Sequence, residues 1–160
     1  MKQEYIEKLQ LAKRLLAWDT SFTEEELCKN VDKGCDLLEE LVKVNDLDIL
    51  TELLEFFTDE NEDYGGVCER LLNDIWDNYT TEQIIEALSK KFDYLVDNNI
   101  TRAVQFVGYS MNLGHFNDVR RIFNTTKTQH STKFLDQFQK WYMKDYPHEI
   151  SLLREDMKKW

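Results

Sequence analysis

Apolar residues recur every three or four positions along almost the whole chain. This spacing places them on one face of an α-helix, which completes a turn in 3.6 residues. No segment alternates apolar and polar residues over the length of a strand, and no Asn-Gly dipeptide marks a tight hairpin. The pattern therefore predicts an all-α protein of about eight or nine helices. Their apolar stripes fall within residues 5–16, 27–42, 47–57, 68–79, 84–95, 100–111, 116–123, 134–142 and 147–160.

Polar residues between the stripes predict where helices begin and end. Residues 21–24 (Ser-Phe-Thr-Glu) and 80–83 (Thr-Thr-Glu-Gln) have the spacing of a capping box, in which two residues hydrogen-bond reciprocally across the first turn. Asp46 is a candidate N-terminal cap, because its carboxylate can accept from the first free backbone N–H groups. Gly114 is a candidate C-terminal cap.

Two polar segments predict connections rather than helices. Residues 59–63 (Asp-Glu-Asn-Glu-Asp) carry no apolar side chain, so we expect a polar turn there. Residues 124–131 are also almost entirely polar and predict a loop. Pro147 suits the first turn of a last helix, where its missing N–H is not needed.

A weak internal repeat follows the same stripes. Helices predicted to begin near Asp46, Thr81 and Phe116 are 35 residues apart. A repeated helical hairpin buries its apolar face by stacking on its neighbours. The sequence thus favours a single all-α domain over residues 1–160, with stacked antiparallel helical hairpins forming a short HEAT-like α-solenoid. The alternative is an irregular helical bundle, in which the spacing is simply the length of two helices and their loops.

Composition narrows the class of protein. Only 5 Gly and 1 Pro among 160 residues argue against collagen-like, low-complexity and turn-rich all-β chains, and 42% hydrophobic residues argue against disorder. No run of about 18 apolar residues predicts a membrane span, and the start of the sequence lacks the pattern of a signal peptide. Three cysteines cannot all pair within one chain and suit a reducing compartment. We therefore expect a cytoplasmic protein.

Charge is distributed unevenly along the chain. The 31 Asp and Glu against 20 Lys and Arg give a net charge of −11, but residues 19–97 alone carry −17 while 1–18 carry +2 and 98–160 carry +4. Such a field repels nucleic acids and anionic lipids and attracts cationic partners. The basic C-terminal third offers only a weak case for phosphate binding. The sequence therefore predicts a protein partner, with no nucleic acid and no membrane.

Many of the carboxylates gather on one predicted helix pair, residues 47–79. Folding does not explain this crowding, because like charges at helix spacing destabilise by a few tenths of a kcal/mol each. We interpret it as a docking surface for a cationic protein, with Trp76 as an aromatic anchor. The alternatives are a solvated face that keeps the protein soluble and a half-buried Trp76 that covers the groove between helices. The candidate partner-binding residues are Glu55, Asp59, Glu60, Glu62, Asp63, Asp74, Trp76 and Asp77.

The sequence carries no recognised catalytic motif. A Gly-rich phosphate loop, a GxSxG nucleophile elbow and an HExxH zinc pair are all absent, and His115, His130 and His148 are scattered. Residues 59–63 resemble the acidic start of a calcium loop but lack the Gly that its sixth position requires. Residues 69–77 have carboxylates at a spacing that could bind Mg²⁺, but no opposite helix offers a matching set. We expect no enzymatic activity, no cofactor and no metal.

The segment 45–54 (Asn-Asp-Leu-Asp-Ile-Leu-Thr-Glu-Leu-Leu) and the acidic helix pair that continues to Asp77 carry a family resemblance. The chain resembles the immunity proteins of bacterial toxin–immunity systems, including those of contact-dependent growth inhibition. The resemblance is one of type and covers most of the chain loosely. It has no diagnostic motif, so no residue takes a role from a family pattern.

This resemblance implies a non-catalytic protein that binds and neutralises a cognate basic toxin domain, such as a nuclease. Its carboxylates would meet the Lys and Arg side chains with which the toxin holds nucleic-acid phosphates. Two alternatives remain open. One is a helical-repeat adaptor that binds another protein in an apolar groove with modest salt sensitivity. The other is a hydrolase with a carboxylate-bound metal.

Overall fold

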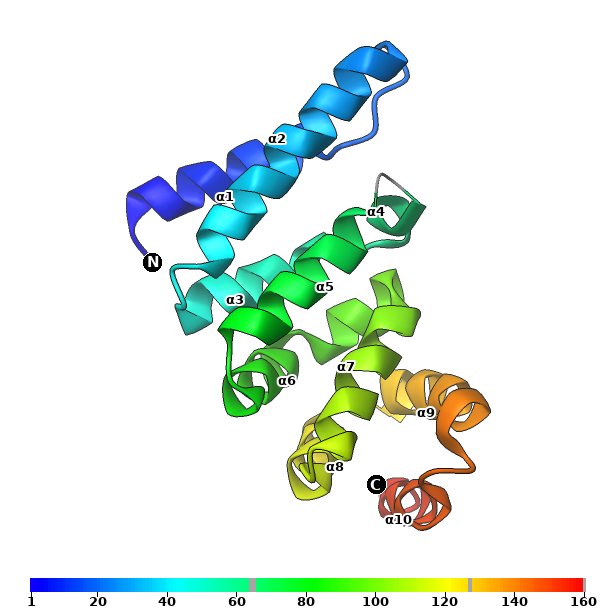
Figure 1. The fold of residues 1–160 in the computed structure, drawn as a ribbon. Coiled ribbons are helices and arrows are strands. Elements are labelled where there is room, and N and C mark those ends of the chain that lie inside the picture. The colour runs from blue at the N-terminus through cyan, green and yellow to red at the C-terminus, as the bar shows by residue number, and fades with distance from the viewer. Residues whose placement is uncertain (64–65, 127, 160) are drawn as a thin grey trace. The chain divides into compact units, whose positions relative to one another are not determined.

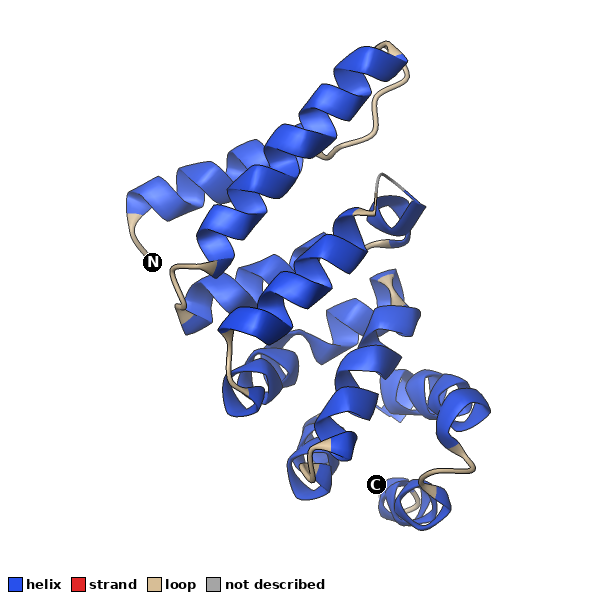
Figure 2. Ribbon diagram, in the orientation of Figure 1, coloured by secondary structure: helices blue, strands red, loops and turns tan. Residues whose placement is uncertain are grey.

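The computed structural model describes residues 1–63, 66–126 and 128–159, and every regular element within these ranges is a helix (Figure 2). The predicted all-α class is therefore confirmed for the described residues. The contacts of the chain divide it into two compact units, an N-terminal unit (Met1–Ala87) and a C-terminal unit (Leu88–Trp160). The single domain over residues 1–160 stays a prediction beside this division.

The N-terminal unit is held together by a row of packed helices. In Figure 1, α1 and α2 lie side by side, and α5 runs beside α2. A fully buried core of leucines and isoleucines, among them Leu41, Leu50 and Ile75, joins these elements. The elements are α1 (Gln3–Leu15), α2 (Glu24–Val42), α3 (Leu47–Leu53), the 3₁₀-helix η1 (Leu54–Phe56), α4 (Asp59–Asp63), α5 (Val67–Asn78) and the first part of α6 (Thr81–Asn98).

The close approach of α1 and α2 depends on a glycine in the interior of α2. A Cβ atom at Gly34 would lie 2.7 Å from both Cγ and Cδ2 of Leu16, the residue that ends α1. Carbon atoms in contact are normally about 3.5–4.0 Å apart. Any side chain larger than hydrogen at Gly34 therefore overlaps with Leu16.

The C-terminal unit has an aromatic core. Phe134 lies 5.0 Å from Phe92 and 5.3 Å from Phe123, measured between ring centroids, and Phe138 stacks on it at 5.3 Å. All four rings are almost completely buried. The elements are the second part of α6, α7 (Ile100–Asn112), α8 (Phe116–Thr125), α9 (Thr128–Tyr142) and α10 (Pro147–Met157).

Four of the predicted helix boundaries are confirmed and one is wrong. Pro147 is the first residue of α10. The Asp46 carboxylate accepts from the N–H of Asp48 at 2.9 Å. Residues 80–83 form a capping box, and Gly114 follows α7 with a φ of +88°. The box predicted at 21–24 lies two residues later, between Thr23 and Glu26. The sequence offers both positions, because Ser21 precedes Glu24 by three residues and Thr23 precedes Glu26 by three residues.

Two predicted connections are helical instead. Residues 59–63 form α4, because the hydroxyl of Thr58 accepts from the N–H of Asn61 and the buried Asn61 amide donates to the Phe56 carbonyl at 2.7 Å. Part of the predicted loop 124–131 belongs to α9, whose first turns bury the polar side chains of His130 and Ser131. In both places buried polar residues replace the apolar stripe on which the prediction relied.

Candidate protein-binding surface

Two of the predicted partner-binding residues are engaged within the N-terminal unit. The Lys13 ammonium lies 2.7 Å from a carboxylate oxygen of Glu55, and the backbone N–H of Trp18 donates to Glu60 at 3.0 Å. These two contacts connect α1 and the segment after it to η1 and α4. Within its own chain, Glu55 is therefore paired with a cation and Glu60 accepts a backbone hydrogen bond.

The other predicted residues fall into two groups on α4 and α5. Asp59 is exposed and Glu62 is half-buried on α4, while the side chain of Asp63 lies outside the described part of the structure. Asp74, Trp76 and Asp77 lie in the second half of α5. In Figure 1, α4 stands at the beginning of α5.

The two groups are separated along the axis of α5. A helix rises 1.5 Å per residue, so Asp74 lies roughly 10 Å beyond Val67, the first residue of α5. The predicted set is thus not one compact patch. Asp74 and Asp77 instead share a surface with residues of α2.

This surface is the α2–α5 acidic seam, which we define as Asp32, Asp36, Glu39, Asp74 and Asp77. The guanidinium of Arg70 stands between the helices, 3.9 Å from a carboxylate oxygen of Asp32 and 4.0 Å from one of Asp36. Both aspartates remain well exposed, with side-chain exposures of 78% and 72%. At these distances one exposed arginine compensates them only weakly.

Burial and neighbouring carboxylates act together on the carboxyl group of Asp74. Burial is the first cause that raises the pKa of this carboxyl above its ordinary value, and the negative charges of Glu39 and Asp77 raise the pKa further. Arg70 and Lys43 oppose the shift without cancelling it. The ionised form of Asp74 is therefore disfavoured in the folded protein, and an added cation would relieve it.

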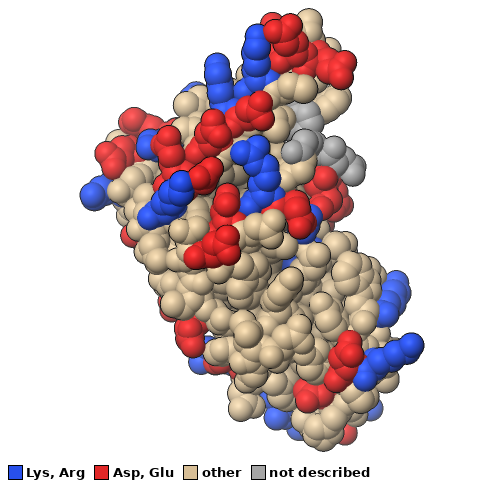
Figure 3. Space-filling model, in the orientation of Figure 1, with Lys and Arg blue, Asp and Glu red and all other residues tan. Residues whose placement is uncertain are grey.

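The seam belongs to a strongly acidic unit. The N-terminal unit has 8 Lys and Arg against 23 Asp and Glu, a net charge of −15, whereas the C-terminal unit has 12 against 8, a net charge of +4. Figure 3 shows acidic and basic side chains intermingled over the helices of the N-terminal unit. The carboxylates on α2 and α5 therefore form a negative surface interrupted by single cations.

The α2 members of the seam are residues that sequence reasoning missed. Asp32, Asp36 and Glu39 follow an i, i+4, i+7 spacing, which places them on one face of α2. That spacing is a signal readable from the sequence. What the sequence does not reveal is that this face lies beside α5.

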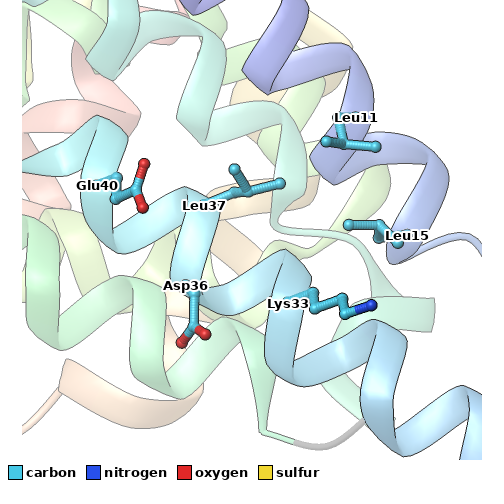
Figure 4. Close-up of a pocket in the computed structure, with 6 residues that line it drawn as sticks. All are labelled: Leu11, Leu15, Lys33, Asp36, Leu37 and Glu40. Carbon is cyan, nitrogen blue, oxygen red and sulfur yellow. The ribbon is translucent and has the colours of Figure 1, made fainter.

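An open hollow of about 270 Å³ lies between α1 and α2, next to the seam (Figure 4). Leu37 points from α2 toward Leu11 and Leu15 of α1 and forms the apolar wall with them. The Leu11 side chain is 39% exposed. The remaining lining residues are Lys33, Asp36 and Glu40. Asp36 therefore belongs to both the hollow and the seam.

A polar cluster around the buried His130 joins α6 to α9 in the C-terminal unit. The Nε2 atom of His130 lies 2.8 Å from a carboxylate oxygen of Asp97, and its Nδ1 atom lies 3.6 Å from one of Asp93. The hydrogen bond to His130 is the first cause that lowers the pKa of Asp97. His130 is only 7% exposed, whereas the Asp97 side chain is 55% exposed, so the pair links α9 to the surface of α6.

The described residues contain no group of three or more His, Cys, Asp or Glu side chains arranged to hold a metal ion. None of the helices in the described ranges combines the length and the apolar content that crossing a bilayer requires. Comparison with protein families, with curated proteins and with solved structures finds no match for this chain.

Proposed function

We propose that the chain is a non-catalytic cytoplasmic protein that binds a basic protein through the acidic surface of its N-terminal unit. The observation that carries the proposal is the α2–α5 acidic seam, in which carboxylates of two neighbouring helices lie close together and, with burial, raise the pKa of Asp74. A lysine or arginine from a partner would neutralise this surface. The charge of −15 on the unit would also speed association with a cationic protein.

The most specific form of this proposal is the neutralisation of a cognate basic toxin domain, such as a nuclease. A toxin of that kind holds nucleic-acid phosphates with Lys and Arg. An acidic protein that occupies the same cations excludes the substrate without any chemistry of its own. No cofactor or metal is required for this activity.

We further propose that the helices stack as antiparallel hairpins in a HEAT-like arrangement within each unit. Links between helices recur at similar sequence separations. The hydroxyl of Tyr79 donates to the carbonyl of Asp46, 33 residues earlier, and His130 is likewise 33 residues after Asp97. Arg120 and Asp156, a part-buried pair on α8 and α10, are 36 residues apart. Recurring separations of this kind support a stacked repeat.

A helical-repeat adaptor is the second candidate function, and the hollow between α1 and α2 favours it. An adaptor would bind mainly through the apolar wall of Leu11, Leu15 and Leu37. Its affinity would change little with salt, whereas binding through the seam would weaken steeply as salt screens the charges. The salt dependence therefore separates the two candidates.

The experiment uses the full chain, immobilised and exposed to lysate of its native host at low salt, and compares three proteins. The wild type is compared with a seam variant that carries Asp32→Lys, Asp36→Lys and Asp77→Lys. A control variant carries Asp136→Lys, Asp145→Lys and Glu155→Lys on exposed positions of the C-terminal unit. Both variants change the net charge equally, so only the place of the charge differs.

We expect a single basic protein to be retained by the wild type and the control and lost by the seam variant. A further variant with Asp59→Lys and Glu62→Lys tests the α4 part of the predicted surface in the same way. Equal retention by all variants, or no retained protein, contradicts the proposal. For the toxin form, the recovered protein is assayed for cleavage of RNA and DNA, which one equivalent of the chain should abolish.

A further inference from the structure

The hollow between α1 and α2 has the size of an anchor site for side chains. Its volume of about 270 Å³ lies just below the usual range for ligand pockets, which is roughly 300–1,000 Å³. It is open to solvent and walled by leucines of two neighbouring helices (Figure 4). A cavity of this kind suits one or two large apolar side chains of a protein better than a whole small molecule.

The hollow is lined by a pair of apolar residues on α1 and a pair of acidic residues on α2. Leu11 and Leu15 are one turn apart on α1, and Asp36 and Glu40 are one turn apart on α2. A partner helix with apolar residues at i and i+4 and cations on its flank would match both pairs at once, because its own spacing is the same. This is the helix-in-groove mode of recognition.

The charge around the hollow determines which kind of partner helix binds there. The described residues that line the hollow include the carboxylates of Asp36 and Glu40 and the cation Lys33. Lys8 lies 2.8 Å from Glu40, whereas Arg70 lies 4.0 Å from Asp36, so the 72% exposed Asp36 is the less tightly paired carboxylate. Asp36 also continues into the α2–α5 acidic seam, and the surrounding unit carries −15. A basic helix is therefore attracted and an acidic helix repelled.

We propose that the hollow binds the apolar face of a basic amphipathic helix of the partner protein, with leucine-like anchors against Leu11, Leu15 and Leu37 and cations over Asp36 and the seam. The inference rests on the proposed function and adds the site and the shape of the bound segment. The apolar contacts provide affinity in the hollow, and the cations determine orientation.

The test uses synthetic helical peptides and the full chain. The probe is a fluorescein-labelled 18-residue peptide with Leu on one face and Lys on its flanks. One comparison peptide has Glu in place of each Lys, and another has the Leu/Lys composition in a scrambled order without an apolar face. Fluorescence anisotropy gives the dissociation constant for the wild type and for two variants. Leu11→Gln removes part of the apolar wall, and Leu113→Gln is the control, which removes another exposed leucine from the C-terminal unit.

We expect the Leu/Lys peptide to bind more tightly than both comparison peptides. Leu11→Gln should weaken its binding by about tenfold, since a buried apolar anchor contributes on that order. Leu113→Gln should leave binding unchanged. Circular dichroism confirms that both variants remain folded, which the exposure of both positions favours.

Three results overturn the inference. Equal affinity of the scrambled and the ordered Leu/Lys peptide refutes an apolar anchor. Unchanged peptide binding by Leu11→Gln refutes the hollow as the binding site. The proposed function still stands in that case if the seam variant fails to retain the partner protein. A wild-type dimer in sedimentation that Leu11→Gln dissociates assigns the hollow to a second copy of the chain instead.

Discussion

Replacing Gly34 by alanine tests whether the packing of α1 on α2 requires a residue without a side chain. The new Cβ would stand 2.7 Å from two carbon atoms of Leu16 and 3.3 Å from a third. Leu16 is only 2% exposed, so its side chain has little room to move away. The two helices must separate, or Leu16 must leave its preferred conformation.

The expected magnitude follows from two opposing effects. Overpacking of a buried site typically costs about 1–3 kcal/mol. Replacing a glycine by alanine in a helix interior stabilises by roughly 0.5–1 kcal/mol. We therefore expect Gly34→Ala to lower the free energy of unfolding by up to about 2.5 kcal/mol.

A double-mutant cycle isolates the overlap from the helix effect. Leu16→Ala alone should cost about 2–5 kcal/mol, because it leaves a cavity. In that background the overlap is gone, so Gly34→Ala should stabilise by up to about 1 kcal/mol. The measurement is equilibrium urea unfolding of the wild type, both single variants and the double variant. The sign of the effect of Gly34→Ala should reverse between the two backgrounds.

The same loss of stability in both backgrounds, within about 0.5 kcal/mol, would refute the reasoning. It would mean that Gly34 is required for a reason other than its contact with Leu16. A gain in both backgrounds would also contradict it, since the close approach would then be relieved at no cost.

Two further predictions concern the pH dependence of stability. Because the pKa of Asp74 is raised in the fold, its ionised form destabilises the protein at neutral pH, so Asp74→Asn should raise the free energy of unfolding by up to about 1 kcal/mol at pH 7. This difference should disappear in urea unfolding as the pH falls below about 4, where both proteins are neutral at the site. The Arg120 guanidinium lowers the pKa of Asp156 to about 2, so their pairing contributes stability that is present above pH 4 and lost as the pH falls toward 2. Thermal unfolding followed by circular dichroism should show a shallower acid loss for Asp156→Asn, and an unchanged acid limb would contradict the pairing.

The helices could be predicted because most of them bury one apolar face. The stripe that contains Leu50 and Leu53 and the one that contains Leu71 and Ile75 lie where α3 and α5 form. The prediction failed where burial involved polar groups. The amide of Asn61 in α4 and the imidazole of His130 in α9 are buried by hydrogen bonding, which apolar spacing does not register.

The acidity of the candidate surface was predictable, but its grouping was not. A count of charges locates the excess of carboxylates before residue 98. Whether Asp74 faces α4 or α2 depends on how helices pack across a turn of the chain, which local spacing does not determine. The seam forms because α5 lies beside α2, and this brings Asp74 toward Glu39.

Side-chain links between helices of the N-terminal unit close within that unit, and this affects how the protein folds during synthesis. Lys13 and Glu55 are 42 positions apart, and Asn45 and Gln83 are 38 apart. Both links lie entirely within the N-terminal unit, so neither has to wait for the rest of the chain. Once residue 87 has left the ribosome, the N-terminal unit has every residue that it needs. Translation at about 5–20 residues per second then leaves it several seconds to fold while the C-terminal unit is still being made.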